Sequence, residues 1–134
     1  MDATLVDSNV ILDIVTEDPD WLDWSAAALA RQADAGPLIV NPVIYAEVAA
    51  RFERIEVLEA ALPEEYFQRQ ALPWEAAFLA GRSFVQYRRR GGARRSPLPD
   101  FYIGAHALIG GMTLLTRDAT RYRTYFPKLR IIAP

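Results

Sequence analysis

The feature that most constrains the fold is a set of short apolar runs that lie far apart along the chain. They cover residues 3–6, 38–40, 113–116 and 131–132. Segments with apolar residues at helical spacing separate these runs, and no Asn-Gly type hairpin turn joins two of them. Short buried strands that alternate with helices favour right-handed βαβ units, in which parallel strands form a sheet covered on both faces. We therefore predict an α/β fold, a three-layer α/β/α sandwich with a central, mostly parallel sheet of about four to five strands.

The composition is that of one compact domain. The chain has 134 residues, of which 51% are hydrophobic, and this is enough for a single buried core over residues 1–134. Cysteine is absent, which excludes disulfides, thiolate zinc sites and cysteine nucleophiles, and the expected localisation is cytoplasmic. The N-terminus lacks the features of a secretory signal. The longest stretch without Asp, Glu, Lys or Arg, residues 101–116, is shorter than the ~20 residues of a spanning helix, so we expect no membrane segment.

Charge is distributed unevenly along the chain. Residues 1–75 hold 15 acidic and 4 basic side chains, whereas residues 76–134 hold 2 acidic and 11 basic ones. This asymmetry suggests a basic surface for a polyanion beside an acidic surface, unless folding interleaves the two parts. Asp100 and Asp118 stand out because they are the only acids after position 75.

The strongest basic cluster lies within residues 88–95. Its members are Arg88, Arg89, Arg90, Arg94 and Arg95. The planar fork of arginine matches phosphate, so this cluster is a candidate RNA-binding segment. The alternative is a solvated helix end whose cations complement the helix dipole, and the sequence leaves both interpretations open.

Four acids lie where parallel α/β sheets place their ligand sites, beyond the carboxyl ends of the strands. Asp7 directly follows the first apolar run, Asp118 follows the third, and Asp100 opens the helix that leads into the third run. Glu47 lies roughly one to two turns into the helix after the second run. All four can therefore meet at one edge of the sheet. Taken singly, each also fits a helix cap, a charge set against the helix dipole or a solvated helix residue.

Four carboxylates at one edge need compensation for their charge. Each pair would repel by roughly 3 kcal/mol at about 5 Å and an effective dielectric constant near 20. No lysine or histidine lies beside these motifs, so a divalent cation is the natural compensation, and Mg²⁺ or Mn²⁺ suits the oxygen ligands. We expect Asp7 and Asp100 to hold the first ion, and Glu47 and Asp118 to complete its shell, hold a second ion or orient the attacking water. This is the chemistry of phosphodiester hydrolysis.

Asn9 and Thr116 are candidate supporting residues. Both lie close in sequence to the predicted metal ligands, where they could hydrogen-bond a carboxylate or a metal-bound water. Both residue types also suit turns and caps, which is the alternative explanation.

Together these motifs resemble a known family. They are Asp7-Ser8-Asn9 after an N-terminal strand, the helical Glu47, Pro99-Asp100-Phe101 at the start of a helix, and Thr116-Arg117-Asp118 after a strand. The chain resembles the PIN-domain ribonucleases. More narrowly, its length and its ending, through Leu115 to Asp118 and Tyr122 to Phe126, are similar to the VapC-type toxins of bacterial toxin-antitoxin pairs. The resemblance implies a PIN-like sandwich, endoribonuclease activity that depends on Mg²⁺ or Mn²⁺, a homodimer, and inhibition by a cognate antitoxin.

Other classes of protein fit the four acids less well. A receiver-type signalling module also gathers acids and Mg²⁺. Its pattern is an adjacent pair of acids early in the chain and a lysine at the end of a strand, whereas here Asp7 is followed by Ser8-Asn9 and the only lysine is Lys128. A haloacid-dehalogenase-like phosphatase would have a second Asp at the position of Asn9. A catalytically silent binding partner is the remaining alternative.

Some aromatic residues and the single histidine have the residue types of binding sites but also fit ordinary structural roles. Trp21 and Trp24 lie one helical turn apart and fit either half-buried core or a partner-binding stripe. The mixed aromatic and basic residues 122–126 favour core packing over a surface for single-stranded RNA. His106 has no second His or Cys with which to share a metal, so we expect an ordinary helix residue.

Overall fold

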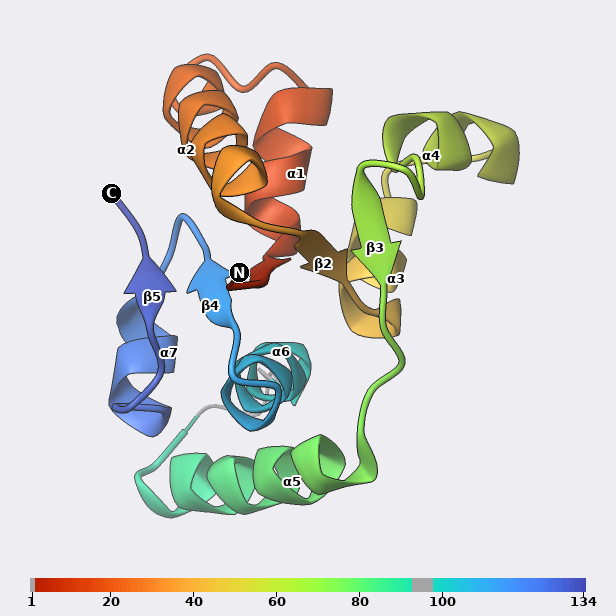
Figure 1. Cartoon of the computed structure of the whole chain (residues 1–134). Helices are drawn as coiled ribbons and strands as arrows, with labels where there is room; N and C mark the ends of the chain where they lie inside the picture. Colours follow the sequence, from red (N-terminus) through yellow and green to blue (C-terminus); the bar gives the residue numbers. More distant parts are fainter. Residues whose placement is uncertain (1, 93–97) are drawn as a thin grey trace.

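The computed structural model describes residues 2–92 and 98–134, and its centre is one five-stranded sheet (Figure 1). The strands are β1 (Thr4–Val6), β2 (Leu38–Val40), β3 (Phe67–Arg69), β4 (Thr113–Leu115) and β5 (Ile131–Ile132). Their order in the sheet is β3-β2-β1-β4-β5, and each neighbouring pair is parallel. The predicted α/β class with a mostly parallel sheet is confirmed, and within the described residues the sheet is parallel throughout.

Helices cover both faces of this sheet. They are α1 (Ser8–Val15), α2 (Leu22–Ala35), α3 (Pro42–Ala49), α4 (Ile55–Ala61), α5 (Trp74–Arg89), α6 (Leu98–Ile109) and α7 (Thr120–Tyr125). Figure 1 shows α1 and α2 on one face and α6 on the other, with α5 packed against the outer side of α6. None of the helices in the described part of the chain is both long enough and apolar enough to cross a membrane.

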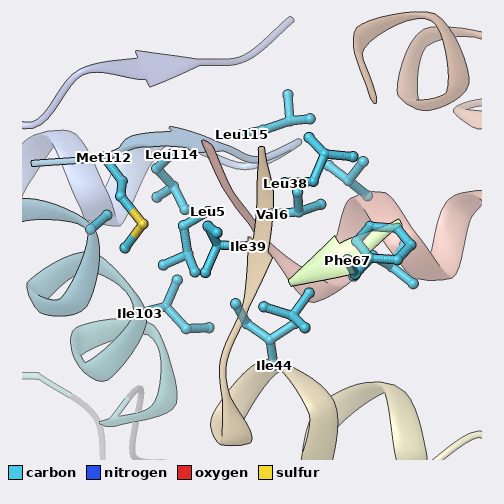
Figure 2. Packing of buried hydrophobic residues seen from close by; sticks show 14 of the residues in the cluster. Leu5, Val6, Leu38, Ile39, Ile44, Phe67, Ile103, Met112, Leu114 and Leu115 are labelled. Carbon is cyan, nitrogen blue, oxygen red and sulfur yellow. The ribbon is translucent and has the colours of Figure 1, made fainter. Parts of the chain in front are cut away.

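The three central strands of the sheet, β2, β1 and β4, form the centre of the core. A strand buried on both faces carries apolar residues in succession, and this is why the short runs show no alternation with polar residues. Leu5, Ile39 and Leu114 lie on neighbouring strands and point toward Ile44 of α3 and Ile103 of α6 (Figure 2). All five side chains are buried. The sheet is therefore a rigid platform for the segments that leave its carboxyl edge.

The topology brings two distant segments together at that edge. The chain passes from β1 to β2 and β3 on one side, and then returns to add β4 and β5 on the other side of β1. The carboxyl ends of β1 and β4 thus form the point where the strand order reverses, which is where ligands bind in open parallel sheets. The main-chain N–H of Asp7 donates to Leu115 O at 2.9 Å, which joins the two segments directly.

A buried polar pair sets α3 against α6. The Asn41 side chain caps α3 by accepting a hydrogen bond from Ile44 N at 2.9 Å, and Pro42 takes the first helical position. The Asn41 amide nitrogen lies 3.0 Å from Nδ1 of His106, to which it donates. Burial lowers the pKa of His106, so the ring is neutral and can accept this hydrogen bond. The pair holds the helix that carries Glu47 against the helix that carries Asp100.

Gly104 allows α7 to pack closely on α6. A methyl group added at Gly104 would lie 2.5 Å from Cε2 of Phe126 and 3.1 Å from Cδ1 of Tyr122. Both rings are buried, so neither can move aside into solvent. The absence of a side chain at Gly104 therefore leaves room for the Phe126 and Tyr122 rings to pack against α6.

Gly104→Ala should lower the free energy of unfolding by about 1–3 kcal/mol, because the added methyl overpacks the contact between α6 and α7. Gly81→Ala in α5 is the matched control: its methyl meets no atom within 4 Å. Alanine favours helix over glycine, so Gly81→Ala should raise the free energy of unfolding by about 0.5–1 kcal/mol. Urea unfolding followed by circular dichroism measures both. Equal stability of the two variants would contradict the packing at Gly104.

Candidate active site

Asp7 is the most buried acid at the carboxyl edge of the sheet. It follows β1, and only 4% of it is exposed. Its Oδ1 accepts a hydrogen bond from Ser8 N at 2.7 Å, and its Oδ2 accepts from Thr116 Oγ1 and from Tyr122 Oη, both at 2.9 Å. Three donors from different parts of the chain thus hold this carboxylate in one orientation.

Burial raises the pKa of Asp7 to about 6. Loss of hydration is the largest cause, and the charge of Asp100 acts in the same direction. The hydrogen bonds from Thr116, Tyr122 and Ser8 N oppose the rise. Burial also raises the pKa of Tyr122 well above its ordinary value, with the charge of Asp7 adding to the effect, so the phenol stays protonated and remains a donor.

Glu47 and Asp100 lie near Asp7. Glu47 is half-buried on α3, and its Oε1 accepts a hydrogen bond from Ser8 Oγ at 2.9 Å. Burial raises the pKa of Glu47, and the charges of Asp7 and Asp100 raise it further. Asp100 lies in the first turn of α6, where its Oδ2 is 2.6 Å from Nη1 of Arg121. Three of the four predicted acids therefore share one electrostatic environment.

Asp118 lies at the rim of this group. Its side chain is exposed, and Oδ1 is 3.5 Å from Thr120 N at the start of α7. Its main-chain N–H donates to Thr116 Oγ1 at 3.2 Å, and this hydroxyl in turn donates to Asp7. Asn9 joins the same hydroxyl through its amide nitrogen at 3.2 Å. The structure thus places Thr116 against Asp7 directly, and Asn9 and Asp118 one contact further away.

The acids are engaged by protein groups. Within residues 2–92 and 98–134, no three carboxylate or imidazole side chains lie close enough together to form a ready-made metal cage. Arg121 pairs with Asp100, and Ser8 donates to Glu47. The arrangement is a group of carboxylates around a buried Asp7, each with its own partner.

Comparison with known proteins assigns this chain to a family. The sequence matches the PIN domain over residues 4–127, which is nearly the whole chain. The chain belongs to the PIN domain family. PIN domains are nucleases, and they generally use divalent metal ions. No curated protein matches the sequence.

Solved structures show the same PIN fold. The chain is similar to VapBC2 from Rickettsia felis bound to a DNA fragment from its promoter, with a TM-score of 0.75, 15% identity and 98% of both chains covered. It is also similar to VapBC-1 from nontypeable Haemophilus influenzae, with a TM-score of 0.73, 17% identity and coverage of 98% of this chain and 97% of that one. A toxin-antitoxin complex from Klebsiella pneumoniae matches with a TM-score of 0.66, 19% identity and coverage of 96% and 95%. At these identities the likeness concerns the fold.

The residues of this PIN domain fit a hard divalent cation. The group consists of carboxylate and hydroxyl oxygens, which are the ligands that Mg²⁺ and Mn²⁺ prefer. Burial raises the pKa of both Asp7 and Glu47, so a bound cation would offset the cost of keeping two anions out of water. His106 already accepts a hydrogen bond from Asn41, so it is engaged on the core side of α6.

The sequence does not predict the contacts that two hydroxyl residues make with the acids. Tyr122 packs in the core, as the sequence predicts, and its hydroxyl also donates to Asp7. Ser8 links two acids, because its N–H donates to Asp7 and its hydroxyl donates to Glu47. Neither residue type is distinctive enough for its position to predict such a contact.

An ion pair between a buried acid and a partly exposed arginine holds the loop after β4. Asp13 of α1 is 2% exposed and accepts two hydrogen bonds from the Arg117 guanidinium, at 2.8 and 2.9 Å, and one from Ser25 Oγ at 2.7 Å. The guanidinium carbon lies 5.4 Å from the centroid of the Trp21 ring. Trp21 is half-buried, as one of the two sequence interpretations expects, and its ring also supports an arginine. An acid at the apolar spacing of α1 is the signal that could have identified Asp13.

Two arginines at the end of α5 lie over aromatic rings. The guanidinium carbon of Arg88 is 5.9 Å from the centroid of Phe84, and that of Arg90 is 5.4 Å from the centroid of Tyr125. Arg89 is exposed at the end of the helix. Arg94 and Arg95, the other two members of the predicted RNA-binding cluster, lie outside the described residues.

Asp7→Asn tests whether the buried charge of Asp7 opposes folding when metal is removed. The folded pKa of about 6 exceeds the ordinary value of 3.8, so folding favours the protonated acid. The stabilisation linked to Asp7 is complete below about pH 3.8 and is lost as the pH rises through about 6. In EDTA, the stability of Asp7→Asn should therefore rise relative to wild type across this window, by up to about 3 kcal/mol. Urea unfolding at a series of pH values measures the difference.

Asp34→Asn serves as the control, because Asp34 is an exposed acid on α2. Its stability should follow the wild-type pH profile. If the free energy of unfolding changed with pH in the same way for wild type and Asp7→Asn, the charge of Asp7 would not destabilise the folded protein.

Proposed function

We propose that this PIN domain is a Mg²⁺-dependent endoribonuclease, with Mn²⁺ able to substitute, that acts as the toxin of a VapC-type toxin-antitoxin pair. The buried Asp7 carboxylate carries this proposal. Three donors orient it, and the charges of Glu47 and Asp100 lie close enough to act on the same group of side chains. Membership of a nuclease family favours hydrolysis of phosphodiesters over the receiver-type, phosphatase-like and silent alternatives.

The proposed roles follow from the surroundings of each acid. Asp7 and Asp100 would hold the primary metal ion, and Glu47 and Asp118 would contribute to a secondary position. When bound, such an ion polarises the scissile phosphate, lowers the pKa of a water and stabilises the departing oxygen. Burial raises the pKa of Glu47, which suits a group that accepts a proton from water. Asp118 is exposed, so it can meet substrate or water at the rim of the site.

Hydroxyl and amide groups would support the metal ligands. Thr116 and Tyr122 fix Oδ2 of Asp7, and Asn9 positions Thr116 and the main chain of Arg117. Such contacts limit the orientations of a ligand before metal binds, which is how groups behind the ligands tune metal affinity.

The RNA would extend from the acids toward the end of α5. Arg88, Arg89 and Arg90 place positive charge there, and Arg94 and Arg95, which follow in the sequence, would belong to the same RNA-binding segment. Arginine pairs well with phosphate oxygens without regard to base identity. These side chains would therefore add affinity for RNA and little sequence preference.

An antitoxin partner is proposed because the similar structures include VapBC and toxin-antitoxin complexes. This chain has an apolar groove between α1, α2 and α4 that an antitoxin could occupy. The groove is lined by residues that include Ile14, Val15, Ala26, Leu29, Ala60 and Tyr66. Such a groove suits the apolar face of an amphipathic helix.

A homodimer is also part of the proposal. Trp74 and Phe78 lie four residues apart on α5, so both face the same way, and they are 88% and 73% exposed. Large exposed aromatic side chains mark surfaces that bind other proteins. A second copy of the chain would cover this pair.

Nuclease activity is tested by incubating the purified chain with end-labelled structured RNAs in Mg²⁺, in Mn²⁺ and in EDTA. We expect internal cleavage only with metal, and a loss of at least about 100-fold in rate for Asp100→Asn and Glu47→Gln, because each removes a proposed ligand. Asp34→Asn, which lies on α2, should retain wild-type cleavage. Undiminished cleavage in EDTA, or by both ligand variants, would exclude the proposal.

The antitoxin groove is tested by placing a charge in it. Ala26 and Ala27 are both exposed on α2, but only Ala26 is among the groove-lining residues. Ala26→Glu should weaken binding of the antitoxin encoded with this chain by at least about 10-fold, because it buries an unpaired carboxylate against apolar surface. Ala27→Glu should bind as the wild type does. Calorimetric titration measures both affinities, and equal affinities would place the partner elsewhere.

A further inference from the structure

Arg121 is a cation placed directly at the acidic group. Its Nη1 lies 2.6 Å from Oδ2 of Asp100, and the two side chains are 40% and 32% exposed. Asp100 in turn raises the pKa of Asp7 and of Glu47. In the described part of the chain, this is the one ion pair between an arginine and a predicted metal ligand. Arg121 therefore compensates the negative charge of the site within the protein itself.

Aromatic packing holds the guanidinium at this place. The guanidinium carbon of Arg121 lies 6.0 Å from the centroid of the Tyr87 ring. Tyr87 packs edge-on against Phe101, the residue after Asp100, at 5.8 Å, and against Tyr125 at 6.2 Å. A planar cation on an aromatic face keeps its edges available for hydrogen bonds. The Arg121 guanidinium can thus change its hydrogen-bond partner without leaving the ring.

The helix that carries Arg121 is tied to the site. Tyr122, the next residue of α7, donates to Asp7 at 2.9 Å and is buried. The backbone of Arg121 is therefore held beside both proposed primary ligands, Asp7 and Asp100. The remaining mobility lies in its half-exposed side chain.

Other arginines nearby are differently placed. Arg117 makes two hydrogen bonds to the buried Asp13, so its guanidinium is committed to the fold. Arg123 is exposed on α7 and forms no ion pair with the described residues. Arg121 alone among these three combines contact with a site acid and access from solvent.

A divalent cation and Arg121 compete for Asp100. The cation takes lone pairs of the carboxylate oxygens, and its two positive charges repel the guanidinium. The displaced guanidinium remains beside the site, where a phosphate matches its fork of donors better than any single carboxylate oxygen does. The same side chain thus fits two successive partners.

We propose that Arg121 is a substrate-binding residue that exchanges partners: it holds Asp100 in the metal-free protein and binds an RNA phosphate once a divalent cation has taken Asp100. This inference rests on the proposed function, and it adds a residue for phosphate recognition together with the order of binding. Metal binding therefore precedes productive RNA binding.

Removal of Arg121 then has two effects of opposite sign. Metal affinity rises because a competing cation is gone, whereas RNA affinity in the presence of metal falls because a phosphate donor is lost. A structural role alone would lower both affinities or leave both unchanged. A rise in metal affinity together with a fall in RNA affinity therefore distinguishes partner exchange from a structural role.

The first measurement is Mn²⁺ binding without RNA, by calorimetric titration of wild type, Arg121→Gln and the matched control Arg123→Gln. We expect the Mn²⁺ Kd of Arg121→Gln to fall by about 5-fold, which is what loss of a partly exposed competing ion pair allows. Arg123→Gln should stay within about 2-fold of wild type. An unchanged or increased Kd for Arg121→Gln overturns the proposal.

The second measurement is binding of a short fluorescent 2′-O-methyl oligoribonucleotide, by anisotropy, in EDTA and in Ca²⁺. In Ca²⁺, Arg121→Gln should bind about 10-fold more weakly than wild type, since a charge-assisted hydrogen bond to phosphate is lost. In EDTA the two proteins should bind alike, because Arg121 is still paired with Asp100 in the wild type. An equal loss under both conditions overturns the exchange.

A further variant guards against a folding defect. Arg121→Lys keeps the charge that competes for Asp100 but lacks the planar fork, so it should retain the wild-type Mn²⁺ Kd and lose part of the oligonucleotide affinity in Ca²⁺. Wild-type behaviour of Arg121→Lys in both assays overturns the proposal. If wild type binds no Mn²⁺ and cleaves no RNA, the proposed function itself fails. If wild type does both and Arg121→Gln matches Arg123→Gln, only this inference fails.

Discussion

The site depends on a carboxylate kept out of water at the end of a buried strand. Asp7 would be costly there if its charge were unpaired, and three donors reduce that cost: Ser8 N, Thr116 Oγ1 and Tyr122 Oη. These donors come from the start of α1, the end of β4 and α7. The N-terminal strand and the C-terminal third of the chain therefore meet at one functional group, and the parallel pairing of β1 with β4 makes that meeting possible.

The uneven charge of the sequence is partly neutralised within the fold. Arg117 pairs with the buried Asp13, and Arg130 pairs with Asp2, so bases from the second part of the chain compensate acids from the first. The count of charges along the sequence thus overstates the separation of acidic and basic surfaces. Part of the positive charge that forms no such pair lies at the end of α5, where Arg88 and Arg90 lie over aromatic rings.

Asp100 lies close to the other acids but is paired with an arginine, and among the described residues no three acids form a preformed metal site. Asp100 belongs to the first turn of α6, it raises the pKa of its acidic neighbours, and it pairs with Arg121. Internal pairing lowers the repulsion between carboxylates when no metal is bound. In the proposed function, the same pairing would compete with an incoming cation for Asp100, so that stability of the metal-free protein and affinity for metal would be opposed at this residue.

The sequence by itself determined the fold class and the position of the acids along the chain. Unbroken apolar runs predict strands buried on both faces, and an acid directly after such a run, as at Asp7, has to lie at the carboxyl edge of the sheet. Only the tertiary structure decided which side chains meet there. Arg121 and Arg123 have similar sequence contexts, yet only Arg121 pairs with Asp100, because Tyr122 is buried and bonded to Asp7 and so fixes which face of α7 meets the site. Asp13 and Arg117 lie 104 residues apart, and no local pattern encodes a contact that depends on strand order.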